Sequence, residues 1–387
     1  MIHSSVPGVI IQRLTSCGCA RAIPPFASYL FCSLVFTYPL VLQLGTHVPG
    51  AVAGDVPVYI WNLWWTRFAL LAGTSPLFSD YIFAPHGVSL VFHAFVFFKA
   101  LLAIPLQALF STWTSYNLLI LETFTVSAYF MYLLARHLTS NRAAAWVAGL
   151  IYGFSPYMLT RGTGHLNYLS GEFIPLYVLF LLRLIEDRRA RWAVGGGFCL
   201  LFTAYCEYYY LIYLSIFTLA YLTYRIRRDP TTILRADLVK AFCLMAAIAA
   251  VGFSPILWAL LTASESGFIY GGWSGSAKMG ADLLAFVVPP VGSLVYGDIG
   301  RDLYAVFTGG NAIEGTVFVG FTALALTVWS SVRLRRDTQV RPWLWITLLF
   351  WLLSLGPLLH IGGDFVFGFG PVRFSIPLPY FLVHYIP

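Results

Sequence analysis

Few side chains in this sequence could do acid–base chemistry, and two of them lie in one stretch near the N-terminus. Only 10% of the 387 residues are charged, yet Asp55 and Asp80 both occur among the aromatic side chains of residues 50–88. A partly buried carboxylate can act as a general base and remove the proton of an attacking hydroxyl. We take Asp55 as the candidate base; the alternative is that it caps a helix beginning at Pro57.

Other candidate groups follow later in the chain. Glu207 stands before three tyrosines and could orient an acceptor as a second catalytic carboxylate, or it is an acid in an aromatic belt. Arg161 and His165 could bind phosphate; the alternatives are a snorkelling arginine and a loop histidine with ordinary hydrogen bonds. The further substrate-binding candidates are Asp80, which could equally be a turn residue, Glu172, Lys278 and Arg301.

Cofactor signals are weak. Asp55 with Asp80 or His165 could hold a divalent ion such as Mg²⁺ or Mn²⁺. The sequence contains no Walker loop, dinucleotide fingerprint or zinc-ligand spacing. The formal net charge of +7 does not form a basic stripe within a soluble fold, which argues against a nucleic-acid partner. We interpret the positive charges as topology signals on cytoplasmic loops.

Composition identifies the chain as an integral membrane protein. It is 59% hydrophobic with a mean hydropathy of +0.77, whereas soluble domains are about half apolar and about a quarter charged. The long apolar runs predict an all-α polytopic protein with the lipid bilayer as its surroundings. We treat residues 1–387 as a single transmembrane domain.

The placement of arginines predicts the topology. Arg13 and Arg21 precede the first apolar run, so the N-terminus is expected in the cytoplasm. If residues 89–111 form an interfacial or re-entrant helix rather than a span, most Lys and Arg residues fall on the cytoplasmic side. The chain then has about nine transmembrane helices, near residues 26–45, 114–135, 143–159, 170–187, 190–205, 208–224, 238–262, 315–332 and 342–360.

This topology places most of the acidic residues on or near the outer face, and the others among the cytoplasmic arginines. The first outer loop, 46–113, would hold a second interfacial helix at residues 57–71, rich in tryptophan, and a long outer loop would cover 263–314. Glu122 is left inside a predicted span and is expected to face the same cavity, since acids within a membrane seldom face lipid. The last residues form an outward aromatic segment with no closing span, so we expect a truncated chain.

Residues 129–169 contain a span ending in L-L-A-R-x-L, a short basic turn, a small-residue span ending in S-P, and an outer loop with Arg161 and His165. With the preceding Gly-Asp loop, this pattern resembles the C-type (GT-C fold) glycosyltransferases. It is similar to bacterial membrane proteins related to the dolichyl-phosphate-mannose-type protein mannosyltransferases and to the YfhO-like proteins.

The resemblance implies a function and roles for particular residues. An acid in the first outer loop of that superfamily acts as base or positions a metal, and the matching position is Asp55. A second outer acid commonly follows the small-residue span, where this chain has Thr163-Gly164-His165 and then Glu172. The implied donor is a sugar on a polyprenyl phosphate.

The expected function is therefore sugar transfer to a cell-envelope acceptor, outside the cytoplasm, in the bacterial inner membrane. Two rival functions remain open. One is a transporter or flippase of a lipid-linked or anionic substrate, which would show ionisable groups near mid-membrane. The other is a non-catalytic relative.

Overall fold

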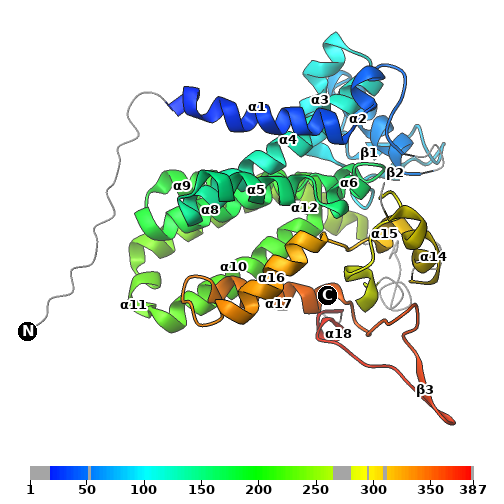
Figure 1. Cartoon of the computed structure of the whole chain (residues 1–387). Helices are drawn as coiled ribbons and strands as arrows, with labels where there is room; N and C mark the ends of the chain where they lie inside the picture. Colours follow the sequence, from blue (N-terminus) through cyan, green and yellow to red (C-terminus); the bar gives the residue numbers. More distant parts are fainter. Residues whose placement is uncertain (1–17, 51–53, 265–279, 294–295, 308–311, 385–387) are drawn as a thin grey trace, which may run out of the picture.

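The structure, a computed structural model, is mostly helical (Figure 1) and describes residues 18–50, 54–264, 280–293, 296–307 and 312–384. Among these residues the strands form two short antiparallel hairpins. In one, Phe78 pairs with Ser89; in the other, Phe367 pairs with Phe374. The hairpin of β3 and β4 projects away from the helices (Figure 1).

The N-terminal half contains the following elements in chain order: α1 (Gly18–Phe36), a 3₁₀ turn (Leu40–Leu42), α2 (Val56–Leu71), β1 (Phe78–Ser79), β2 (Val88–Ser89), α3 (Phe97–Leu109), α4 (Thr112–Thr139), α5 (Arg142–Gly153), α6 (Pro156–Arg161), α7 (Leu166–Leu169) and α8 (Phe173–Asp187).

The C-terminal half continues with α9 (Ala190–Cys206), α10 (Tyr208–Arg228), α11 (Pro230–Ile233), α12 (Ala236–Ser264), a 3₁₀ turn (Leu283–Phe286), α14 (Gly297–Phe307), α15 (Ala312–Gly315), α16 (Phe321–Arg333), α17 (Arg341–Ser354), β3 (Phe367–Phe369), β4 (Val372–Phe374) and α18 (Tyr380–His384).

A tight turn folds α5 back along α4. The last residue of α4 is Thr139, and Ser140 after it has a left-handed φ of 55° that stops the helix. The Asn141 side chain accepts hydrogen bonds from backbone amides in the first turn of α5. The two helices approach closely because α5 presents glycine to its neighbour: a Cβ on Gly153 would lie 2.6 Å from the Cβ of Ala128. Small residues of this kind allow close helix packing in membrane proteins.

Two apolar clusters lie behind the site described below. The first contains residues from every helix between α1 and α7, and these include Tyr29, Tyr59 and Phe124. The second joins α8, α9, α10, α12 and α17 and includes Tyr177 and Leu238. α4 packs against α1, α5 and α8, so it connects the two clusters.

Among the described residues, three helical stretches are long and apolar enough to cross a membrane: Thr112–Thr139, Leu166–Asp187 and Ala236–Thr262. The prediction of about nine spans is therefore not supported, although helices occupy much of every expected segment.

Length and polarity explain the difference. α5, α9, α16 and α17 have 12, 17, 13 and 14 residues, or about 18–26 Å, which is shorter than a hydrocarbon core of about 30 Å. The apolar part of α1 is the short helix Pro24–Phe36. α10 has 21 residues but is rich in tyrosine and has three arginines in its last turn. α3 has 13 residues, a length that fits a segment that does not cross.

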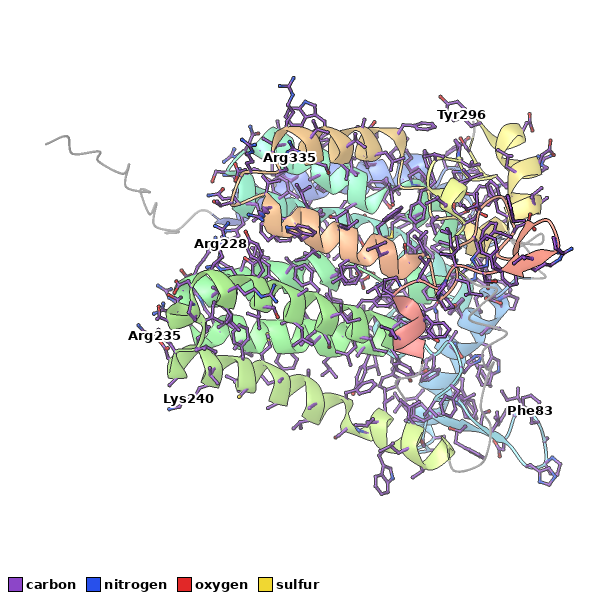
Figure 2. The ribbon with its side chains drawn as sticks, turned by 90° about the horizontal axis from the view of Figure 1, so that it is seen from below. Phe83, Arg228, Arg235, Lys240, Tyr296 and Arg335 are labelled. Carbon is purple, nitrogen blue, oxygen red and sulfur yellow. The ribbon has the colours of Figure 1, made fainter. Side chains whose placement is uncertain are left out.

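The helices have a basic end. Figure 2 shows Arg228, Arg235, Lys240 and Arg335 at one end of the molecule, and Phe83 near the opposite end. α10 runs about 31 Å from Tyr208 to Arg228, so its first residue lies at the end away from the basic side chains. The residues of the candidate site lie at that second end.

Candidate functional site

Asp55 occupies the N-cap position of α2 but does not act as a cap. Its side chain accepts no hydrogen bond from the first turn of the helix, which has proline at its start. The carboxylate is instead 57% exposed, and its Oδ2 lies 3.4 Å from Nε2 of His165. The carboxylate is therefore accessible to a substrate, as a general base must be.

The segment from Arg161 to His165 is held against the first loop by close backbone contact. α6 begins at Pro156 with a Ser155 cap, and the amide of His165 donates to the carbonyl of Arg161 at 2.8 Å. Gly50 has a φ of +107°, and a Cβ there would lie 1.9 Å from the carbonyl oxygen of Thr163. Only glycine fits this contact, which brings the loop before Asp55 to the turn that carries His165.

His165 is buried, with 8% of its surface exposed. Burial lowers its pKa, and the nearby Arg161 lowers it further, while Asp55 and Glu314 oppose these effects. The imidazole is therefore neutral near pH 7. Its Nδ1 has no hydrogen-bond partner within the described part of the chain.

Arg161 is 7% exposed, yet only part of its guanidinium is hydrogen-bonded. Nη2 donates to the carbonyl of Glu314 at 3.0 Å, and the group lies 5.0 Å from the ring centre of Tyr157 and 5.2 Å from that of Tyr168. Nε and Nη1 have no hydrogen-bond partner among the residues that the structure describes. A buried guanidinium with unused donors is suited to binding an anion such as phosphate.

Glu207 is linked to α2 through Asn167. Its Oε2 accepts from Nδ2 of Asn167 at 2.5 Å, and Oδ1 of Asn167 accepts from the Tyr59 hydroxyl at 2.5 Å. Glu207 also caps α10, since Oε1 accepts from the amide of Tyr209 at 3.3 Å. Burial raises the pKa of Glu207, and the hydrogen bond from Asn167 opposes that rise. Tyr59 lies one turn after Asp55, so this chain of bonds brings the two candidate catalytic carboxylates to the same region.

Asp80 does not join this group. α2 has 16 residues, so its ends lie about 24 Å apart. Asp80 is exposed and lines a hollow of about 310 Å³ with Trp65, Phe68 and Ala72, from the second half of the helix. Asp55 at the first end therefore cannot share a metal ion with it. Among the described residues no three His, Cys, Asp or Glu side chains lie close enough together to hold a metal ion.

Two of the remaining predicted substrate-binding residues, Arg301 and Glu172, are also placed elsewhere. Arg301 is exposed on α14, and its Nη2 lies 3.8 Å from Oδ1 of Asp298. Lys278 is outside the described residues. Glu172 is fully buried, and its Oε1 lies 2.7 Å from Nζ of Lys99. Lys99 also contacts Glu122, with 2.6 Å between Nζ and Oε2.

Sequence reasoning missed Tyr59, Asn167 and the role of Lys99. Nothing local in the sequence distinguishes Tyr59 from the other aromatic residues of α2. The available signal for Asn167 was its position two residues after His165. Lys99 was visible as a lone lysine in an apolar segment, and such a group generally needs a partner.

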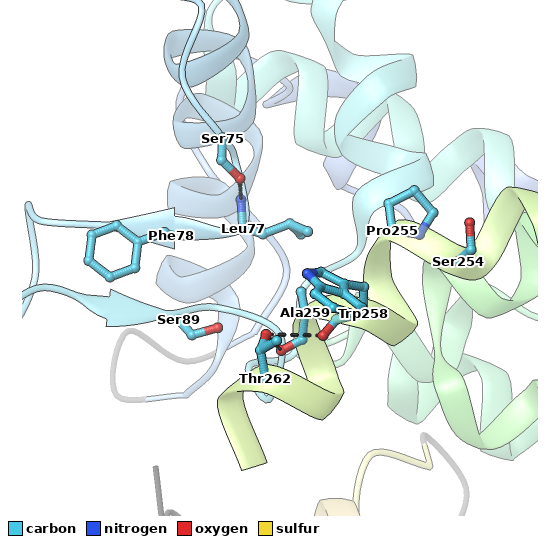
Figure 3. A pocket seen from close by; sticks show the side chains of 9 residues that line it. All are labelled: Ser75, Leu77, Phe78, Ser89, Ser254, Pro255, Trp258, Ala259 and Thr262. Carbon is cyan, nitrogen blue, oxygen red and sulfur yellow. Dashed lines mark hydrogen bonds between the residues drawn. The ribbon is translucent and has the colours of Figure 1, made fainter. Parts of the chain in front are cut away.

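A groove lies at the far end of α2 from Asp55. It has a volume of about 790 Å³ and runs between the hairpin of β1 and β2 and the second half of α12 (Figure 3). Leu77 and Phe78 line one wall, and Pro255, Trp258 and Ala259 line the other. The lining also includes the hydroxyl side chains of Ser75, Ser89, Ser254 and Thr262. It has no charged side chain among the described residues, and its apolar walls suit a hydrocarbon chain.

Comparison with known proteins gives a family but no activity. No curated protein matches the chain. A family model described as "Domain of unknown function (DUF6311)" matches residues 31–382, which is most of the sequence. The chain therefore belongs to the DUF6311 family.

Proposed function

We propose that this protein is a membrane glycosyltransferase that moves a sugar from a polyprenyl-phosphate donor to a cell-envelope acceptor on the extracytoplasmic face. The observation that carries the proposal is the placement of Asp55. Its exposed carboxylate lies 3.4 Å from a neutral histidine, on the turn that also holds the buried guanidinium of Arg161 with two unpartnered nitrogens.

The reaction would proceed by direct displacement. Asp55 takes the proton of the acceptor hydroxyl as the acceptor oxygen bonds to the anomeric carbon of the sugar. The bond from that carbon to the phosphate oxygen breaks, and its electron pair leaves on the phosphate. Arg161 stabilises the charge that develops there. Attack opposite the leaving group inverts the configuration of the anomeric carbon.

Glu207 would orient the acceptor. Its raised pKa and its short contact with Asn167 suit a carboxylate that binds a sugar hydroxyl. Asn167 and Tyr59 are positioning residues that hold this carboxylate relative to α2.

The distribution of charge favours an outward-facing site. The basic side chains labelled in Figure 2 lie at the end of the helices away from Glu207. Cytoplasmic loops carry an excess of Lys and Arg. The site end would then face the periplasm of a bacterial inner membrane.

The groove beside α12 is a place for the isoprenoid tail of the donor. Ala236–Thr262 is the most apolar of the three candidate spans, with a mean hydropathy of 2.1. Only 11% of its most apolar 18 residues are buried within the protein. A groove along such a helix would be continuous with the hydrocarbon of the bilayer, where the tail of the donor lies.

The test is transfer of radiolabelled sugar from a panel of polyprenyl-phosphate donors by the purified full-length protein in detergent. We expect Asp55→Asn to lose about 10²–10⁴-fold in rate, the range for removal of a general base. Asp237→Asn is the matched control, because Asp237 pairs with Arg235 on the exposed surface. Wild-type activity in the Asp55→Asn protein would refute the mechanism.

A transporter or flippase is the second candidate, and one observation favours it. Lys99, Glu122 and Glu172 meet between apolar helices, where ionisable groups often mark a substrate or proton pathway. Absence of turnover with every donor, together with movement of a labelled lipid phosphate across reconstituted vesicles, would support this candidate. Saturable lipid binding with neither activity would indicate a non-catalytic relative.

A further inference from the structure

One lysine and two glutamates form a buried group that the proposed transfer reaction does not use. Lys99 belongs to α3, Glu122 to α4, and Glu172 precedes the first residue of α8. Nζ of Lys99 lies 2.6 Å from Oε2 of Glu122 and 2.7 Å from Oε1 of Glu172. The side chains of Lys99 and Glu172 have no exposed surface. We call these three residues the buried triad.

The charges of the buried triad do not balance. One ammonium faces two carboxylates, so the fully ionised group has a net charge of −1, with Glu172 fully buried and Glu122 35% exposed. Both carboxylates contact the same nitrogen, so their nearest oxygens are at most about 5.3 Å apart. Two carboxylates that share one site disfavour each other's ionised form, and here a single ammonium must compensate both.

Among the residues that the structure describes, no second cation contacts the two carboxylates. Cys206 faces the triad from α9 and Tyr152 faces Glu172 from α5; thiols and phenols are ordinarily uncharged at neutral pH. The Tyr152 hydroxyl donates to the carbonyl of Gly171 at 2.8 Å and so does not serve the carboxylate. Neither oxygen of Glu172 has a hydrogen-bond partner within the described part of the chain, although Oε1 lies 2.7 Å from Nζ of Lys99. A buried carboxylate oxygen without a donor is the expected position for a proton.

We propose that Lys99, Glu122 and Glu172 form a proton-binding site that holds one proton between its two carboxyl groups at neutral pH. The proton exchanges through Glu122, whose side chain is 35% exposed, whereas Glu172 is closed to the outside. An ion pair that served packing alone would need a single carboxylate. The proposal does not depend on the transferase function, because none of the three residues belongs to the group around Asp55.

Infrared spectroscopy of the full-length protein in detergent tests this directly. A protonated carboxylic acid has a carbonyl stretch that shifts in D₂O and that an ionised carboxylate lacks. We would compare the wild type at pH 7 with Glu122→Gln and Glu172→Gln. Each replacement leaves one ammonium and one carboxylate, which is neutral without a proton.

Each single variant and the double variant should lose the same one carboxyl equivalent of this band, because a single proton is shared. Glu186→Gln is the matched control, since Glu186 is exposed beside His137, and it should leave the band unchanged.

The absence of the band in the wild type at pH 7 would overturn the proposal, and this result needs no variant. Persistence of the full band in both single variants would also overturn it. Loss in only one variant would show that a single carboxyl beside the ammonium keeps its proton, which contradicts the charge balance on which the proposal rests. If one variant fails to fold, the infrared bands of the other variant and of the wild type still test the proposal.

Discussion

Replacement of Lys99 by methionine should cost more stability than any ordinary core substitution of similar size. The variant removes the ammonium that contacts both Glu122 and Glu172 and leaves the fully buried Glu172 and the partly exposed Glu122 without a cation. Breaking a buried ion pair by removing one partner costs about 3–5 kcal/mol.

A second route gives the same magnitude. The variant can escape the uncompensated charge by binding one proton more than the wild type. For a glutamate with an ordinary pKa of about 4.3, protonation at pH 7 costs about 3.7 kcal/mol. This cost decreases by about 1.4 kcal/mol for each unit of lower pH, so it should be near 1 kcal/mol at pH 5. The destabilisation is therefore expected to be pH-dependent.

The assay is unfolding in mixed micelles with increasing denaturing detergent, at pH 7 and pH 5. Lys240→Met on α12 is the matched control, since Lys240 is exposed and its loss should change the unfolding free energy by less than about 0.5 kcal/mol. Combining Lys99→Met with Glu122→Gln and Glu172→Gln should restore most of the loss. A Lys99→Met protein as stable as the wild type at pH 7, or equally destabilised at both pH values, would refute the reasoning.

Three further predictions concern the site around Asp55. The lowered pKa of His165 means that the folded protein binds fewer protons at this residue than the unfolded chain does. The contribution of His165 to stability therefore falls as pH drops below about 6.5. His165→Gln should flatten the decrease in melting temperature between pH 7 and 5. Arg161→Lys should weaken binding of a polyprenyl phosphate by about 10-fold or more, measured by titration calorimetry, because lysine cannot replace the planar donors. Gly50→Ala should lower the melting temperature more than Gly73→Ala, since both have positive φ but only Gly50 meets the Thr163 carbonyl; equal shifts would contradict this close contact.

The local features of the fold could be predicted from the sequence. The helix expected at residues 57–71 is α2, Val56–Leu71, because proline and aromatic residues mark its start and apolar face. The three stretches that are long and apolar enough to span were all among the expected segments. The predicted number of spans is not supported, because mean apolarity does not show where a helix ends: α5 stops at Gly153 after 12 residues.

The candidate site was only partly predictable. Asp55, Arg161 and His165 were selected from their positions in outward loops, and the structure brings them to one turn. Glu172 was expected in that group, but it pairs with Lys99, which is distant in sequence. No local pattern encodes such a contact, because packing of α3 against α4 and α9 determines it.

The contacts that assemble the site join segments made at different times during synthesis. The bond from Tyr59 to Asn167 spans 108 positions, and the bond from Arg161 to the carbonyl of Glu314 spans 153. The chain must therefore be synthesised through α15 before the Arg161 guanidinium can donate its hydrogen bond to the Glu314 carbonyl. A chain that is inserted in the membrane but not yet synthesised through α15 would have Asp55 and His165 without the bond from Arg161 to Glu314. In a cell, the complete arrangement would mark molecules that have been synthesised through α15 and have folded.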